Sequence, residues 1–95
     1  MSAAIAANRN NTWWVYILLC EGGRFYCGIS NNLESRFKVH LSGKGAVFTK
    51  INRPVSILAA KAFESHHQAA KVERQLKISA RSVRARWAQD NQLER

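Results

Sequence analysis

Residues 13–30 of the chain read WWVYILLCEGGRFYCGIS, and this stretch decides the fold. An apolar run rich in aromatic and β-branched residues comes first, and Glu21-Gly22-Gly23, which is typical of a turn, separates it from a shorter mixed run. The pattern predicts a β-hairpin that carries Tyr16 in its first strand and Tyr26 in its second. Considered alone, the hairpin is explained most simply as core structure, with the two tyrosines as ordinary strand aromatics.

The rest of the chain predicts helices and one more strand. The expected elements are a helix over about 32–42, a basic loop over 45–54, a strand over 55–63, and helices over about 66–78 and 80–89. Asn31-Asn32 can cap the first helix, and Gly43 can end it in a left-handed conformation. The order β-β-α-β-α-α predicts an α+β fold, in which helices cover a small three-stranded sheet.

The length of 95 residues corresponds to one small domain, which we expect over residues 13–90. Residues 1–12 are expected to form a disordered tail, and residues 91–95 to fray. No apolar run reaches membrane-spanning length, and the first twelve residues lack the features of a signal peptide. We therefore expect a cytoplasmic protein without a membrane partner, in which Cys20 and Cys27 are free thiols.

Charge points to the class of partner. Fifteen basic residues against six acidic ones give a formal net charge of +9. For a domain of this size, such a charge favours a polyanionic partner, most simply nucleic acid. A cationic surface that serves solubility is the plainer alternative. Charge alone does not separate DNA from RNA, or either of them from an acidic membrane surface.

The spacing of several polar residues resembles that of the GIY-YIG endonuclease superfamily, in particular its small stand-alone bacterial members. Tyr26 follows Tyr16 by ten residues, Arg36 follows Tyr26 by ten, and Glu73 falls on a later expected helix. The resemblance covers about residues 13–80, and its central signature reads YCGISNNLESRFKVHLSGKG. The first motif lacks the glycine of the family's name, and the second has a cysteine for isoleucine. The family implies a three-stranded antiparallel sheet flanked by helices.

The resemblance also implies an activity: metal-dependent hydrolysis of phosphodiester bonds in DNA. It assigns Tyr16 as general base, and Tyr26 as hydrogen-bond partner of the attacking water or of a phosphate oxygen. Arg36, whose planar guanidinium suits phosphate, would stabilise the transition state with help from His40. Glu73 would hold a single, weakly bound Mg²⁺ or Mn²⁺, since magnesium needs only one or two protein carboxylates.

Substrate binding is assigned to a glycine and to basic residues. A glycine within a strand suggests close approach of a backbone or a ligand, so Gly28 is a candidate. The basic residues expected to contact phosphates are Lys44, Lys50, Arg53, Arg74, Lys77, Arg81 and Arg84. Ordinary structural roles compete with these assignments: Arg36 can pair with Glu34 or Glu64, and Glu73 can pair with Lys77 four residues later.

A shared site requires that Tyr16 and Tyr26 lie on one face of the sheet. Side chains alternate along a strand, and directly opposed residues share a face. A two-residue Gly22-Gly23 loop would put the tyrosines on opposite faces, whereas a three-residue loop over 22–24 would pair Cys20 with Tyr26 and put both on one face. We therefore predict an odd-length loop, or a bulge that shifts the register by one.

Two other functions remain open beside an endonuclease. The chain is also compatible with a nucleic-acid-binding module that cuts little or nothing. A third interpretation is a subunit whose helix over 80–89 docks on a partner protein that supplies targeting. No expected helix carries a clear set of base-reading side chains, so no sequence preference is predicted. The chain is expected to be a monomer or a weak homodimer.

Overall fold

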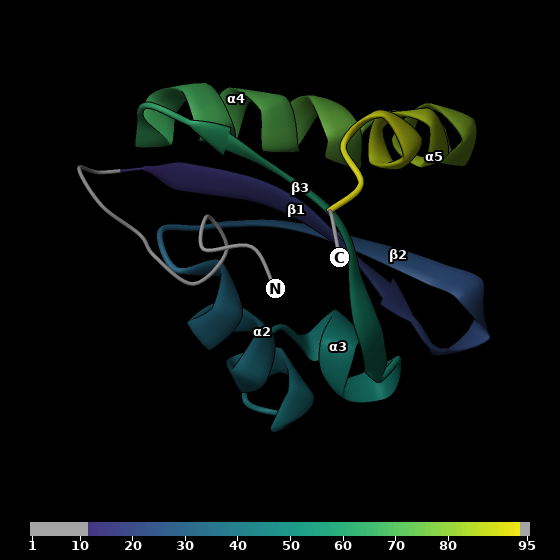
Figure 1. Cartoon of the computed structure of the whole chain (residues 1–95). Coiled ribbons are helices and arrows are strands. Elements are labelled where there is room, and N and C mark those ends of the chain that lie inside the picture. Colours follow the sequence, from purple (N-terminus) through teal and green to yellow (C-terminus); the bar gives the residue numbers. More distant parts are fainter. Residues whose placement is uncertain (1–11, 94–95) are drawn as a thin grey trace.

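Three antiparallel strands form the sheet in the order β2-β1-β3, so the most apolar strand lies in the centre (Figure 1). The strands are β1 (Trp13–Cys20), β2 (Arg24–Ser30) and β3 (Pro54–Phe63). The computed structural model describes residues 12–93. The tail expected over residues 1–12 lies outside the described residues except for Thr12, and so do residues 94–95.

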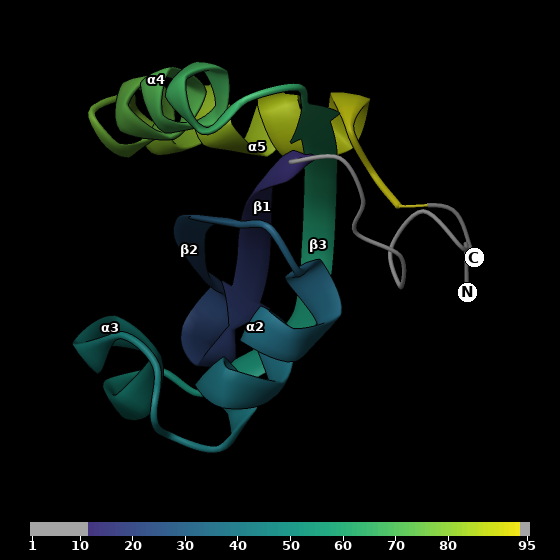
Figure 2. The same ribbon diagram turned by 90° about the vertical axis from the view of Figure 1, so that its left-hand side faces the viewer.

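Helices cover both faces of the sheet, as Figures 1 and 2 show from two directions. The helices are α2 (Leu33–Leu41), α3 (Val47–Ile51), α4 (His66–Lys77) and α5 (Arg81–Asp90). One face is covered by α2 and α3, and the other by α4 and α5. The predicted α+β fold is confirmed, with an antiparallel three-stranded sheet flanked by helices. Within residues 12–93, no helix combines the length and the hydropathy that crossing a bilayer requires.

Helix α3 is a departure from the expected basic loop over 45–54. It has only five residues, which is too short for an apolar periodicity to reveal. Local hydrogen bonds define it instead: the amide of Lys50 donates to the carbonyl of Ala46, and the amide of Asn52 donates to the carbonyl of Phe48. Basic side chains therefore project from a turn of helix and its flanks.

The hairpin has the odd-length turn that a shared face requires. Its three residues are Glu21–Gly23, and both glycines have a positive φ, 78° and 74°. The turn begins one residue earlier than the predicted 22–24, so Leu18 rather than Cys20 pairs with Tyr26, and Tyr16 pairs with Gly28. This shift moves the pairing by two residues, so each side chain stays on the face of the sheet that was predicted for it. The two tyrosines therefore share a face.

Each face of the sheet has its own apolar cluster. The cluster on the tyrosine face, which we call the tyrosine-side cluster, contains Trp14, Tyr16, Leu18, Cys20, Leu33 and Ala60. The cluster under α4 and α5 contains Val15, Ile17, Cys27, Ala59, Ala69, Leu76 and Ala88. Strand β1 contributes to both, which explains why it is the most buried element. Cys20 and Cys27 are free and buried, as expected.

Strand β3 does not alternate regularly along its length. Its pairing with β1 shifts register between Ile17 and Leu18 and again between Leu19 and Cys20. Ile57 therefore packs on the tyrosine-side cluster while Ala59 lies under the opposite helices, although regular alternation would put residues two apart on one face. A bulge adds one residue to one strand of a pair and reverses the faces beyond it. The position of β3 at the edge of the sheet tolerates both the bulges and Pro54 at its start.

Residues 91–93, expected to fray, are instead held against β3. The amide of Ala60 donates to the carbonyl of Asn91 at 3.1 Å, and Gln92 forms an isolated antiparallel bridge with Ala59. Leu93 packs against the tyrosine-side cluster. This segment satisfies part of the free edge of β3, which would otherwise present unpaired backbone groups to solvent.

The turn geometry predicts a specific cost for a side chain at Gly23. Its φ of 74° is left-handed, and a Cβ there would have no neighbour within 4 Å. Gly23→Ala should therefore lower the free energy of unfolding through backbone strain alone, by about 1–2 kcal/mol. Gly23→Asn is the control, because asparagine tolerates this conformation, and it should cost less in urea denaturation. Equal losses for the two variants would contradict the assigned turn.

Candidate active site

Three aromatic rings meet on the tyrosine face between the sheet and α2. Tyr16 is 1% exposed, and its ring centroid lies 6.4 Å from that of the half-buried Tyr26. The imidazole of His40, on α2, lies 6.1 Å from the Tyr16 ring and 5.0 Å from the Tyr26 ring. Three of the residues singled out from the sequence are therefore brought together.

A chain of buried hydrogen bonds runs outward from Tyr16. Its hydroxyl lies 2.9 Å from Nε2 of His40, and Nδ1 of His40 lies 2.9 Å from Oγ1 of Thr49. Thr49 in turn donates to the carbonyl of Ala46 at 2.8 Å. Sequence reasoning missed Thr49, which sits in the stretch expected to be a loop, and no spacing or motif singles it out.

Two glycines provide the space that the Tyr16–His40 pair occupies. A Cβ on Gly28 would lie 2.5 Å from the hydroxyl oxygen of Tyr16, and a Cβ on Gly45 would collide with Nδ1 of His40. The sequence suggested that Gly28 allows close approach of a backbone or a ligand. In the structure, the group that approaches is the side chain of Tyr16, which pairs with Gly28 across the hairpin.

Burial shifts the pKa values of the paired groups in opposite directions. Burial raises the pKa of Tyr16 well above its usual value, with a further contribution from Tyr26, while the neighbouring Arg36 partly opposes the rise. Burial also lowers the pKa of His40, and the charge of Arg36 lowers it further. At neutral pH, the phenol therefore keeps its proton and the imidazole is uncharged.

Arg36 is half-buried and lies one helical turn before His40 on α2. Glu34, its proposed alternative partner, pairs with Lys38 instead, at 3.9 Å. Within the described part of the chain, Arg36 forms no ion pair. Its influence on both Tyr16 and His40 places its charge next to their hydrogen bond.

Glu73 belongs to α4, which covers the face opposite the tyrosines, and yet its charge acts on the same site. Burial is the main cause of the raised pKa values of Tyr16 and of Cys27 on β2, and the charge of Glu73 adds a smaller contribution to both. Lys77, one turn later, lies 3.3 Å from the Glu73 carboxylate, and its Nζ lies 5.8 Å from the centroid of the Tyr26 ring. Because β2 is an edge strand, side chains from the two faces can meet around its free edge.

The basic residues divide into two groups. The exposed side chains of Lys44, Lys50 and Arg53 flank or belong to α3, whose Phe48 ring lies 5.9 Å from that of Tyr26. These basic side chains therefore lie on or beside the helix that carries Phe48, and they are exposed to solvent.

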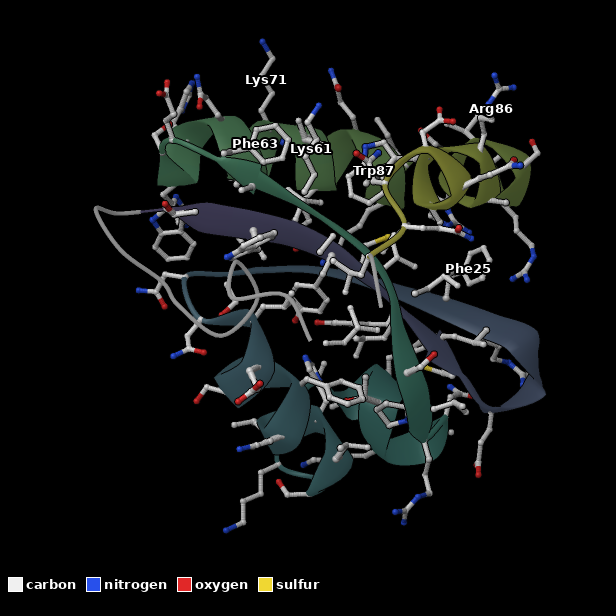
Figure 3. The ribbon with its side chains drawn as sticks, in the orientation of Figure 1. Phe25, Lys61, Phe63, Lys71, Arg86 and Trp87 are labelled. Carbon is white, nitrogen blue, oxygen red and sulfur yellow. The ribbon has the colours of Figure 1, made fainter. Side chains whose placement is uncertain are left out.

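Arg81 and Arg84, which were expected to contact phosphates, have structural partners. Arg81 donates to the carbonyl of Gly23 at 2.6 Å and lies 4.0 Å from the ring of Phe25, which projects on the α5 side of β2 (Figure 3). Arg84 donates to the carbonyl of Ser79, at the junction of α4 and α5. They brace the hairpin turn and the helix junction.

Comparison with known proteins decides the family. The sequence model described as the GIY-YIG catalytic domain matches residues 12–89. The chain belongs to the GIY-YIG family. This membership places the chain in a nuclease family, for which binding to DNA is implied and a divalent metal is the general cofactor.

The GIY-YIG relatives include UPF0213 proteins of similar size. One from Xanthomonas axonopodis pv. citri is 42% identical over 77 residues, which cover 81% of this chain and 76% of the relative. One from Bacillus velezensis is 35% identical over 80 residues, covering 84% and 81%. The solution NMR structure of a UPF0213 protein from Bacillus halodurans has a TM-score of 0.54 at 33% identity, covering 82% and 83% of the two chains.

The donor set of this GIY-YIG domain fits a hard divalent cation held by one carboxylate. Among residues 12–93, no group of three or more histidine, cysteine, aspartate or glutamate side chains gathers as a metal cage. Glu73 is 19% exposed, and its charge reaches both Tyr16 on β1 and Cys27 on β2. A single carboxylate completed by waters and phosphate oxygens is an ordinary magnesium arrangement. Lys77 already neutralises that carboxylate, so a cation would compete with its ammonium group.

The close contact at Gly28 predicts an energetic coupling with Tyr16. Gly28→Ala should lower the free energy of unfolding by about 1–3 kcal/mol, because the added methyl overlaps the phenol. In a Tyr16→Leu background the ring is absent, and the same substitution should cost much less. A double-mutant cycle measured by urea denaturation gives the coupling. Additive effects would show that Gly28 does not make room for Tyr16.

Proposed function

We propose that the protein is a metal-dependent DNA endonuclease that hydrolyses phosphodiester bonds, with Tyr16 as general base and His40 as the acceptor of its proton. The observation that carries this proposal is the buried hydrogen bond between the Tyr16 hydroxyl and Nε2 of His40. The charges of Arg36 and Glu73, which follow the two tyrosines in the family pattern, act on this hydrogen-bonded pair. Membership in the nuclease family supports the same class of reaction.

The raised pKa of Tyr16 determines how it can act as a base. A free phenolate would be costly in this buried position, since burial raises the pKa of the phenol. A relay avoids that species: Tyr16 accepts a proton from the attacking water while its own proton passes to Nε2 of His40. The deprotonated water attacks phosphorus as a hydroxide, and His40 becomes an imidazolium. His40 can accept because its lowered pKa keeps it neutral beforehand.

Arg36 and Tyr26 would act on the phosphate. The guanidinium of Arg36 has no carboxylate partner within residues 12–93, and its hydrogen bond to Tyr16 engages only part of its planar set of donors. The remaining donors would bind phosphate oxygens. It would stabilise the negative charge that develops in the transition state. Tyr26 is only half-buried, and its hydroxyl would donate to a phosphate oxygen or orient the water.

Glu73 would hold the divalent cation, Mg²⁺ or Mn²⁺. When bound, such a cation supplies Lewis-acid stabilisation of the phosphate and its leaving oxygen. Glu73 needs to exchange the Lys77 ammonium, now 3.3 Å away, for this cation. The released Lys77 would then contact a phosphate, together with Lys44, Lys50 and Arg53 around α3.

The Glu73–Lys77 ion pair also favours a second candidate function. A carboxylate that stays neutralised by its own helix binds a cation weakly. The same fold and basic surface would then serve as a nucleic-acid-binding module that cuts little by itself, or as a subunit that a partner protein targets to its substrate. A cleavage assay separates this function from the first.

Nicking of supercoiled plasmid in Mg²⁺, Mn²⁺ or EDTA tests the proposed function. Glu73→Gln and Arg36→Ala should each reduce the rate by about 10²–10³-fold while leaving the fold intact, since each removes one electrostatic stabiliser. Matched controls are Glu34→Gln, which removes the acid of an equivalent helix pair, and Arg86→Ala, on the outer surface of α5 (Figure 3). Unchanged cleavage by Glu73→Gln would remove Glu73 from the metal site.

The pH dependence of cleavage reports the state of His40. The relay needs a neutral imidazole, and the pKa of His40 lies below its ordinary value of about 6.5. The rate should therefore stay high as the pH falls to 6.5 and decline only at more acidic pH. His40→Gln should slow the reaction and remove this limb from the profile. If the rate instead declines around a pH above about 6.5, and still does so in His40→Gln, another group is responsible for the loss of activity at acidic pH.

Binding to DNA should be weakly specific and strongly dependent on salt, because neutralised phosphates release counterions. Lys50→Gln should weaken binding and reduce the slope of log affinity against log salt by about one. Lys71→Gln is the control, since Lys71 projects from the outer surface of α4 (Figure 3). Titrations by fluorescence anisotropy at several salt concentrations measure both slopes. A flat salt dependence would show that the basic surface does not bind the DNA.

A further inference from the structure

The buried hydroxyl of Thr49 has no part in the family pattern from which the other site residues were assigned. We propose that Thr49 is a positioning residue, whose hydroxyl holds His40 in the tautomer that leaves Nε2 free to accept the proton of Tyr16. The proposal rests on the proposed nuclease function for its catalytic consequence. Its structural part, the tautomer of His40, stands on the hydrogen bonds alone.

The direction of the hydrogen bonds follows from what each group can donate. A carbonyl only accepts, so the Oγ1 of Thr49, 2.8 Å from the oxygen of Ala46, gives it the single hydroxyl proton. A lone pair of Oγ1 then faces Nδ1 of His40 at 2.9 Å, and Nδ1 must carry a hydrogen. In a neutral imidazole, Nε2 is then an acceptor, and the Tyr16 hydroxyl donates to it at 2.9 Å.

The other tautomer makes fewer hydrogen bonds with the same atoms. With hydrogen on Nε2, His40 would donate to Tyr16, and Thr49 would have to turn its proton from Ala46 to Nδ1. The four groups would then share two hydrogen bonds in place of three. The proton of the Tyr16 phenol, at a residue 1% exposed, would lose its acceptor. The arrangement with hydrogen on Nδ1 is therefore favoured.

Packing does not explain why α3 holds Thr49 at this place. Thr49 is the only buried residue of α3, and it is polar. The apolar residues Val47 and Ile51 of the same helix are 68% and 74% exposed. Gly45, just before the helix, lacks the side chain that would strike the Nδ1 edge of His40. The segment 45–49 therefore fits the Nδ1 edge of His40 in two ways. Gly45 has no side chain to collide with that edge, and Thr49 supplies a hydroxyl that hydrogen-bonds it.

The consequence for catalysis concerns the proton route. As the Tyr16 O–H bond breaks, an N–H bond forms at Nε2, and the proton of the attacking water replaces the one that Tyr16 gave away. The imidazolium that results keeps its Nδ1–H hydrogen bond to Thr49. Thr49 touches neither the water nor the phosphate in this scheme, and it acts only through His40.

Nitrogen-15 NMR of the histidine side chains in the full chain, without metal or DNA, tests the tautomer directly. At a pH well above about 6.5, wild-type His40 should show a protonated Nδ1 and a bare Nε2. Thr49→Val should shift the tautomer toward hydrogen on Nε2, and Thr49→Ser should keep the wild-type pattern. His66 and His67, both exposed, are internal controls, and His40→Gln identifies the signals.

Cleavage kinetics supply the second measurement. Thr49→Val should lower kcat at least about tenfold and leave KM unchanged, the upper limit being the ~10⁴-fold that a wrong histidine tautomer costs in a serine protease. Thr49→Ser should restore most of the rate. A wild-type His40 with hydrogen on Nε2 overturns the proposal even if Thr49→Val does not fold, and so does a Thr49→Val spectrum identical to wild type. A wild-type protein with the expected tautomer that cuts no DNA overturns the proposed function and leaves the tautomer assignment standing.

Discussion

The three-residue turn Glu21–Gly23 is the constraint on which the rest of the site depends. Its odd length sets the register that puts Tyr16 and Tyr26 on one face, and an even length would separate them by the thickness of the sheet. Once both rings share a face, α2 can bring His40 against each of them. A backbone conformation available chiefly to glycine thus decides whether the side chains of three elements can meet.

Burial shifts the pKa values of Tyr16 and His40 in opposite directions, and both shifts keep the pair uncharged at neutral pH. It holds the proton on the Tyr16 phenol and keeps the imidazole of His40 uncharged. The Tyr16–His40 pair itself therefore contains no ion pair, which would be expensive to break in a desolvated position. The charges instead stand at the margin of the pair, on Arg36 and on the Glu73–Lys77 pair.

Prediction from sequence succeeded where a periodic pattern or a motif was available. Apolar alternation predicted the two hairpin strands and β3. Helical spacing predicted the helices that carry Arg36 and Glu73. It failed where the decisive feature is local: α3 is too short to show a period, and the bulges of β3 have no residue signature. Thr49 could not be found for a related reason, since what distinguishes it is a contact with His40, nine residues earlier in the chain.

The two edges of the sheet are treated differently, and this asymmetry limits how the molecule can associate. Part of the β3 edge is occupied by the chain's own residues 91–93, through the bond to Asn91 and the bridge at Gln92. Another strand could add there only by first displacing that segment. The other edge strand, β2, carries Tyr26, and Nζ of Lys77 lies 5.8 Å from the centroid of the Tyr26 ring. If DNA binds beside Tyr26 as proposed, growth of the sheet on that side would compete with it, so assembly through either edge would carry a penalty.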